Sequence, residues 1–314
     1  MLITERFSNA LLVLMLLLYS SGTIARDLEI TSSLGTGNGE LKWSIADPSG
    51  DPDVLSELIY DAERLYIANI DARITVPRGH LKNLVLGVRA DYNYIAKGSS
   101  EDRDWNESGR NDLYSYSNAE IYGKNLNAYE LYLGYLIHLN DTLSLTPRVA
   151  YHRSEQTFHV RNGVQISSEP PQTTPTGPIE GLDSSYAAQW EGLKVGAELN
   201  LTLSDTLSAR LSAEFLELDY DAKANWNLRD DFAHPVSFRH QAESDRAYRI
   251  NTQLGYRLSS KSSINGWLRY ESFETDAGTD SPYALNDRLR GVTLIGKGEI
   301  EGPEDVIFDR DDHL

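Results

Sequence analysis

The strongest constraint on the fold of this chain is a period of two in its hydrophobicity. Apolar residues alternate with polar ones over ten or more positions, as in the segments 84–94, 142–152 and 193–203. A period of two is the geometry of a β-strand, whose successive side chains point to opposite faces. The sequence therefore predicts an all-β fold. Ten such segments occur, near residues 28–45, 54–75, 82–97, 126–139, 142–160, 185–203, 206–221, 246–258, 262–274 and 288–300.

Alternation alone does not separate a soluble β-sandwich from a transmembrane barrel, since both give each strand one apolar and one polar face. Strand length favours the barrel, because these segments exceed ten residues and strands in globular proteins usually have about five or six. Tyrosines also gather near the strand ends, as the aromatic girdle of a membrane barrel requires. They are Tyr92, Tyr94, Tyr129, Tyr132, Tyr135, Tyr151, Tyr248, Tyr256 and Tyr270.

The connections between segments alternate between short and long. The short ones consist of turn residues and lie at 77–80, 140–141, 204–205 and 259–261. The long ones hold most of the glycine, proline and acidic residues and cover roughly 37–53, 98–125, 161–184, 222–245 and 275–287. Short turns on one side and long loops on the other are typical of outer-membrane barrels. We therefore predict a ten-stranded antiparallel transmembrane β-barrel with long extracellular loops.

Composition excludes several other classes. None of the 314 residues is cysteine, which excludes a disulfide scaffold and a cysteine-based zinc site. The net charge of −18, from 29 basic and 47 acidic residues, argues against a nucleic-acid partner. A helical membrane protein is excluded because the one long apolar run lies at the N-terminus. The histidines show no ligand spacing, so neither a metal nor another cofactor is expected.

The N-terminal residues 1–25 have the pattern of a signal peptide. Arg6 precedes an apolar core at 10–19, and small residues follow before a cleavage point after Ala25. A buried N-terminal helix is the alternative. The predicted organisation is a signal peptide at 1–25, a barrel at 26–300 and an acidic tail at 301–314. An exported chain without cysteine fits the outer membrane of a Gram-negative bacterium, with the loops at the cell surface.

A barrel of ten strands has a narrow interior. Eight strands leave a lumen just filled by side chains, whereas porins use about sixteen. Charged residues in mid-strand are therefore predicted to form a packed network of ion pairs, which argues against a general pore and places function in the loops and rim. These residues are Arg89, Asp91, Lys194, Glu198, Arg210, Glu214, Arg249, Arg269 and Glu271.

The densest group of reactive side chains is the segment 101–105, where Asp102 and Asp104 are separated by one residue. At a strand end the two carboxylates point the same way. Two carboxylates at such a short distance raise each other's pKa and can position a water molecule between them. The alternative interpretation is a solvated acidic loop beside Trp105.

In these residues, and along most of the chain, the sequence resembles the omptins, a family of outer-membrane endopeptidases. In that family an Asp pair faces an Asp-x-His pair across a cleft at the rim, and a water molecule between the pairs attacks the peptide bond. The resemblance implies that Asp102 and Asp104 are the catalytic Asp pair. It is carried by Ser33-Leu34-Gly35-Thr36, Ser56-Glu57-Leu58, Asp102-Arg103-Asp104-Trp105 and the segment 186–196.

Other positions depart from the omptin pattern. The resemblance places Asn227 and Arg229 where omptins have their Asp-x-His pair. It places Trp43 and Asn225 where omptins have acidic residues that bind a basic side chain of the substrate. An arginine cannot accept a proton, so Arg229 cannot replace a histidine base. His234 is the nearest candidate for a substitute.

Two functions remain open. In the first, the chain is a degenerate peptidase whose loops serve binding or adhesion. In the second, it is an active endopeptidase with an altered catalytic set. The expected partners are outer-membrane lipid, lipopolysaccharide as an activating lipid, and a polypeptide substrate or surface ligand. The protein is expected to be monomeric.

Overall fold

The computed structural model describes residues 27–170, 172, 174–259, 262–275 and 277–283, without the side chains of residues 27 and 124–126. Within these residues the chain forms nine long strands and three short ones. No helix in this part of the chain is long and apolar enough to cross a membrane. The strands are β1 (Asp27–Ile45), β2 (Ser56–Thr75), β3 (Leu84–Glu107), β4 (Asn111–Tyr135), β5 (Ile137–His138), β6 (Leu143–Ser168), β7 (Gly177–Pro178), β8 (Asp183–Thr202), β9 (Leu207–Asn225), β10 (Phe238–Arg257), β11 (Ser263–Thr275) and β12 (Thr279–Pro282).

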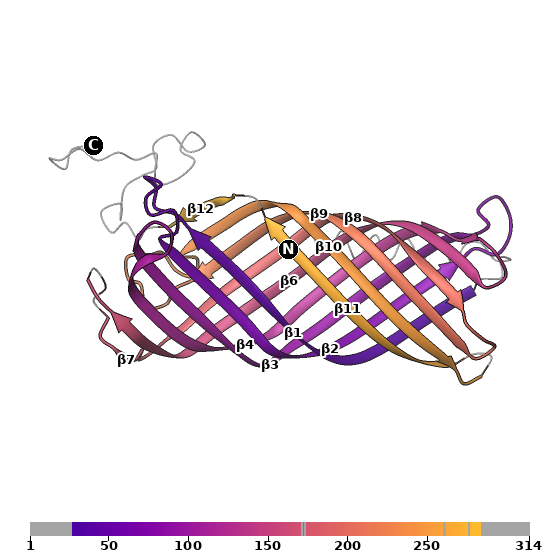
Figure 1. Ribbon diagram of the computed structural model, residues 1–314, viewed down its shortest axis with the longest axis horizontal. Helices are drawn as coiled ribbons and strands as arrows, with labels where there is room; N and C mark the ends of the chain where they lie inside the picture. Colours follow the sequence, from indigo (N-terminus) through magenta and orange to yellow (C-terminus); the bar gives the residue numbers. More distant parts are fainter. Residues whose placement is uncertain (1–26, 171, 173, 260–261, 276, 284–314) are drawn as a thin grey trace.

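One antiparallel sheet contains all of these strands, and Figure 1 shows it wrapped into a barrel of steeply tilted strands. The order β1-β2-β3-β4-β6-β8-β9-β10-β11 pairs each long strand with its neighbours in the chain. Ion pairs reach across the interior between strands far apart in this order. Asp91 on β3 binds Arg269 on β11 at 3.0 Å, and Glu29 on β1 binds Arg210 on β9 at 3.0 Å. The all-β barrel predicted from alternation is confirmed.

The short turns are stabilised by their own side chains. Asn140 Oδ1 accepts hydrogen bonds from the backbone N–H groups of Thr142 and Leu143, both at 2.9 Å. Ser204 Oγ accepts from the backbone N–H groups of Thr206 at 3.3 Å and Leu207 at 3.1 Å. Such local bonds replace the ladder bonds that a reversing chain loses.

The outer face of the barrel carries an apolar belt of exposed aliphatic and tyrosine side chains. On β3 the belt ends at Tyr94, and beyond it Lys97 forms an ion pair with Glu63. Six of the predicted girdle tyrosines are exposed on this face, namely Tyr92, Tyr94, Tyr129, Tyr135, Tyr256 and Tyr270. The prediction was wrong for Tyr132, which is 4% exposed and donates a hydrogen bond to Asp71 at 3.0 Å. It shares the inward face of β4 with Glu130, so it belongs to the lumen.

Buried ion pairs fill the middle of the lumen, as the sequence predicted. Lys194 binds Glu130 and also Glu214, at 2.9 Å. Arg249 binds Glu130 at 3.0 Å, and Arg148 binds Glu214. We call this group the charged layer; it consists of Glu130, Arg148, Lys194, Glu198, Glu214 and Arg249, each 7% exposed or less.

Towards the long loops the lumen is closed by aromatic rings. Tyr60 stacks on Phe158 with ring centres 4.6 Å apart and on Tyr186 at 5.4 Å, and all three are fully buried. Trp43 stacks on Tyr186 at 5.9 Å and meets Phe238 edge-on at 5.9 Å. These five side chains, from β1, β2, β6, β8 and β10, form what we call the aromatic layer. It separates the rim from the charged layer.

The long connections are shorter than the sequence predicted, because several strands continue above the apolar belt. β3 and β4 form a hairpin that extends to Glu107 and Asn111, so most of the predicted loop 98–125 is strand. The alternation fades there because the outer face above the belt carries polar side chains such as Glu101 and Arg103, which form an ion pair with each other. The predicted tenth strand at 288–300, the signal peptide at 1–25 and the tail at 301–314 lie outside the described residues.

Candidate functional site

Asp102 and Asp104 lie on the extension of β3 above the belt. Asp102 pairs with Leu58 on β2, and Asp104 pairs with Ser56. Two residues earlier, Ser100 pairs with the fully buried Tyr60 of the aromatic layer. Because alternate residues share a face, both carboxylates point to the inside of the barrel, above the aromatic layer. The two side chains that the sequence singled out are therefore neighbours at the rim.

The surroundings of this pair favour its protonated form. Burial and the adjacent Asp104 raise the pKa of Asp102 to about 8, although the charge of Arg229 lowers it in part. Burial also raises the pKa of Asp104, against hydrogen bonds from Ser56 and Ser115 and the charge of Arg229. Two carboxyls in one part-buried place cannot both ionise freely, so the pair retains a proton at neutral pH.

Tyr114 on β4 belongs to the same site. Burial first, and then the charges of Asp104 and Asp102, raise the pKa of its hydroxyl. The sequence does not indicate Tyr114 because its place depends on the pairing of β3 with β4, where Asp104 lies opposite Ser115. Tyr114 lies at a register shift between β3 and β4, which regular alternation does not reveal.

Arg229 faces the carboxylate pair without binding it directly. Its charge acts on both carboxyls, but its guanidinium forms a two-pronged ion pair with Asp231, at 2.8 Å and 2.7 Å. It also lies over the ring of Phe232, 4.6 Å from the centroid. Among the described residues, no hydrogen bond or ion pair joins Arg229 to Asp102 or Asp104, so it acts on the pair through its charge alone. The local partner two residues away holds the side chain instead.

Asn227 is occupied by contacts within its own surroundings. Its Oδ1 accepts hydrogen bonds from the backbone N–H of Asp183 at 2.9 Å and from Ser184 Oγ at 3.1 Å. Its Nδ2 donates to the backbone oxygen of Gly181 at 2.8 Å. The side chain fastens the loop after β9 to the start of β8. Asn227 therefore holds the backbone at Gly181 and Asp183 and, within the described part of the chain, makes no hydrogen bond that would orient the Arg229 side chain.

Asn225 and His234 form a pair of their own. Asn225 Oδ1 lies 2.8 Å from His234 Nδ1 across an exposed part of the loop between β9 and β10. Among the described residues, no hydrogen bond or ion pair joins His234 to Asp102 or Asp104. His234, the candidate substitute base, is thus held by Asn225.

Trp43 leads to a second group that the sequence did not reveal. Its ring meets that of His240 edge-on, with centroids 4.7 Å apart, and His240 also lies 4.9 Å from the ring of Phe238. His240 Nδ1 lies 2.8 Å from the hydroxyl of Tyr186, and its Nε2 lies 3.3 Å from Asp280. His240 and Asp280 are distant in sequence and meet because β12 pairs with β10. This histidine therefore packs against the aromatic layer.

No group of three or more histidine, aspartate or glutamate side chains able to hold a metal ion occurs in the described part of the chain. The reactive groups around the carboxyl pair are a tyrosine hydroxyl and a guanidinium paired to Asp231. The same end of the barrel also holds the histidines His234, beside Asn225, and His240, beside Asp280.

Comparison with protein families identifies the chain. The model of the Protochlamydia outer membrane protein family (Pom) matches residues 33–295. The chain belongs to the Pom family. The matched residues span the barrel from β1 onward, so this Pom chain is an outer-membrane protein. A second family model, the N-terminal part of strictosidine synthase-like proteins, matches only residues 281–314.

Among solved structures, the Pom chain is similar to the outer membrane protease OmpT from Escherichia coli. The TM-score is 0.57 at 13% sequence identity, and the match covers 84% of this chain and 100% of that one. At this identity the likeness shows a shared fold, which supports the resemblance to omptins at the level of the barrel. No curated protein matched the Pom chain in sequence.

Proposed function

We propose that this protein is a non-proteolytic omptin-like barrel whose rim binds polypeptides at the cell surface. The observation that carries the proposal is the state of Arg229 and Asn227. Arg229 is paired to Asp231, and Asn227 is bonded to the backbone at 181 and 183. Neither side chain can take a proton from a water held by Asp102 and Asp104. A general base contributes about 10²–10⁴ in rate, so its loss suppresses hydrolysis strongly.

Peptide hydrolysis by refolded protein tests this proposal, with and without lipopolysaccharide, because outer-membrane lipid surrounds the apolar belt. We expect the native protein to leave basic peptides intact. The double variant Asn227→Asp with Arg229→His introduces a histidine base and a carboxylate beside it. Recovery should be partial, because a carboxylate at position 227 cannot donate to the Gly181 oxygen as Asn227 does at 2.8 Å. Robust cleavage by the native protein, abolished in Asp104→Asn, would contradict the proposal.

Binding is tested separately with a fluorescent basic peptide. The double variant Asp102→Asn with Asp104→Asn removes the charge that the rim site presents. We expect at least about tenfold weaker binding, since a few central residues usually supply most of the binding energy of an interface. Asp141→Asn, in an exposed short turn at the other end of the barrel, is the matched control and should bind as the native protein does. Equal binding by both variants would place the peptide elsewhere.

The alternative proposal, an active endopeptidase, draws support from the protonation of the carboxyl pair. A pKa of about 8 for Asp102 leaves one proton on the pair at neutral pH, the state in which paired aspartates act as acid and base in aspartic proteases. Such an enzyme would need no histidine. Its activity would fall above about pH 8, as Asp102 ionises, and would vanish in either Asp102→Asn or Asp104→Asn while surviving in His234→Gln.

A further inference from the structure

Below the charged layer, near the short turns, the lumen holds two adjoining cavities. Their volumes are about 60 Å³ and about 170 Å³, and both are lined by Arg210, Gln253 and Asn265. The larger one reaches Thr202 and Ser208, on either side of the turn at 203–206. We call the two cavities together the inner vestibule. In an outer-membrane barrel the end with short turns faces the periplasm, so the vestibule opens to that side.

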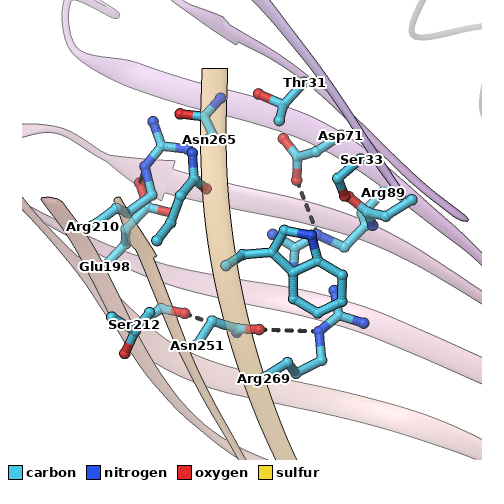
Figure 2. Close-up of a pocket in the computed structure, with 14 residues that line it drawn as sticks. Thr31, Ser33, Asp71, Arg89, Glu198, Arg210, Ser212, Asn251, Asn265 and Arg269 are labelled. Atoms are coloured by element: carbon cyan, nitrogen blue, oxygen red, sulfur yellow. Dashed lines mark hydrogen bonds and ion pairs between the residues drawn. The ribbon is translucent and has the colours of Figure 1, made fainter. Parts of the chain in front are cut away.

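The charged groups that line the vestibule are neutralised by one another or by neighbours. Arg89 binds Asp71 at 3.1 Å, and Arg269 binds Asp91 at 3.0 Å. Arg210 binds Glu29 at 3.0 Å and lies 3.4 Å from Glu198. Figure 2 shows Arg89, Asp71, Arg210, Glu198 and Arg269 arranged around the cavity. A charged ligand would have to break such a pair, so the vestibule favours a neutral one.

Uncharged polar groups of the lining remain available. Among the described residues, no hydrogen bond is made by the side chains of Thr31, Ser33 and Gln253. The Asn265 side chain makes one such bond, donating to Ser263 Oγ at 3.5 Å. By contrast, Asn251 is occupied, donating to Ser212 at 3.0 Å and accepting from Arg269 at 3.0 Å, as Figure 2 shows. The available set therefore comprises two hydroxyls and two amides, which can both donate and accept.

One wall of the vestibule is an aromatic ring. Trp267 lines the cavity and lies against β1 at Gly35, where the Cβ of any larger residue would come within 2.7 Å of the ring. Glycine at position 35 thus leaves the space that the indole occupies. Arg269 lies 5.5 Å from the centroid of the same ring. An indole beside amides and hydroxyls offers both an apolar surface and hydrogen-bonding groups.

We propose that the inner vestibule binds one neutral sugar or a comparable cyclic polyol from the periplasmic side. The hydroxyls of such a ligand match the amides of Gln253 and Asn265 and the hydroxyls of Thr31 and Ser33. Its C–H face matches the indole of Trp267. Thr31, Ser33 and Trp267 line only the cavity of about 60 Å³, whereas Gln253 and Asn265 line both cavities, so a single ring would have to extend from the indole into the cavity of about 170 Å³. Binding sites recur in the mouths of β-barrels. This site lies at the opposite end of the lumen from the rim site and does not depend on the function proposed there.

Tryptophan fluorescence of the refolded full chain tests the proposal, with glucose and N-acetylglucosamine as probes. The other four tryptophans, at positions 43, 105, 190 and 226, belong to the rim half of the barrel. A saturable change in fluorescence with a neutral sugar is expected, and it should be absent in Trp267→Phe. Glucose 6-phosphate should bind at least about tenfold more weakly, because no lining cation is unpaired. Tighter binding of the phosphate, or no saturable binding of either neutral sugar, would overturn the proposal.

Variants distinguish a specific site from a general effect on the barrel. Gln253→Leu keeps the side-chain volume but removes the amide, and we expect at least a tenfold loss of sugar affinity. Gln241→Leu, on the same strand β10 at the rim end, should have no effect. Gly255→Val should also weaken binding, because its Cβ would lie 2.7 Å from Asn265 Oδ1 and 2.9 Å from Ser208 Oγ, within the vestibule. Equal affinities in Gln253→Leu and Gln241→Leu, with both proteins folded by gel mobility, would exclude the site.

Discussion

At the scale of single residues, Asp102 has the most unusual environment at the rim. It is partly exposed, yet it shares one face of β3 with Asp104 and lies above a closed layer of rings. The charge of Arg229 would stabilise its ionised form more strongly if Asp231 did not hold that guanidinium. Burial and the charge of Asp104 therefore raise the pKa of Asp102, and the charge of Arg229, which is already paired to Asp231, lowers it only in part.

This balance predicts how stability depends on pH. The pKa of Asp102 is about 8 in the folded protein and about 3.9 in an unfolded chain. Between these values the unfolded state has released the proton and the folded state retains it, so the free energy of unfolding falls as pH rises from 4 to 8. Asp102→Asn should flatten this slope and stabilise the protein at pH 8 by about 1–2 kcal/mol, allowing for solvent screening of a partly exposed group. Urea unfolding in detergent micelles at pH 5 and pH 8 measures the effect.

The appropriate control is Asp141→Asn, which should retain the native slope because Asp141 is exposed in a turn. An unchanged slope in Asp102→Asn would mean that the proton is held by another group of the rim.

At the scale of elements, each strand has one face for the membrane and one for the lumen. β8 carries Lys194 and Glu198 inward, while Leu193 and Val195 are exposed on the belt. Four residues apart on one strand, the two inward charges bind different partners. Lys194 binds Glu130 on β4 and Glu214 on β9, whereas Glu198 binds arginines on β2, β6 and β9. The charged layer thus joins strands that share no backbone hydrogen bonds.

Removing one member of this layer should destabilise the whole sheet. Glu198 is 4% exposed and binds Arg73 at 2.7 Å, Arg148 at 3.4 Å and Arg210 at 3.4 Å. Glu198→Ala leaves buried arginine charge uncompensated, which costs about 3–5 kcal/mol. Glu107→Ala, at the exposed end of β3, should cost less than about 0.5 kcal/mol. Comparing the two urea midpoints tests this, and equal midpoints would mean that the lumen is hydrated enough to screen the pairs.

At the scale of the whole molecule, the barrel is held by backbone bonds between neighbouring strands and by contacts across the lumen. Among the described residues each long strand pairs with its neighbours in the chain. A barrel that also closes leaves few backbone groups unpaired, which makes membrane barrels resistant to detergent. The aromatic layer and the charged layer add two internal connections at different depths.

We therefore expect the extracted protein to change mobility on heating. In a gel with dodecyl sulfate, unheated protein should migrate as a compact monomer, and boiled protein should migrate as the unfolded chain. A single band, unaffected by boiling, would contradict a closed barrel. A ladder of larger unheated species would contradict the monomer that the sequence leads us to expect.

From the amino-acid sequence alone come the all-β class, nine of the ten predicted strands and the inward charges, and the predicted tenth strand at 288–300 lies outside the described residues. Each of these follows from local alternation, because a strand that separates lipid from a wet lumen must change character at every residue. The adjacency of Asp102 and Asp104 followed in the same way from their spacing on one strand. Alternation did not predict the parts of the strands that extend above the membrane, as in the long hairpin of β3 and β4.

The surroundings of the carboxylate pair, in contrast, depend on how the strands pack together. Tyr114 reaches the pair through strand register, Arg229 is drawn to Asp231 by a local ion pair, and His240 meets Asp280 because β12 pairs with β10. The position of Trp43 in the aromatic layer depends on rings from β8 and β10. Tyr114, His240 and Trp43 take their partners from other strands, so local spacing does not encode these contacts. For Arg229, the nearby Asp231 and the carboxylate pair compete as partners, and only the folded rim determines which of them it binds.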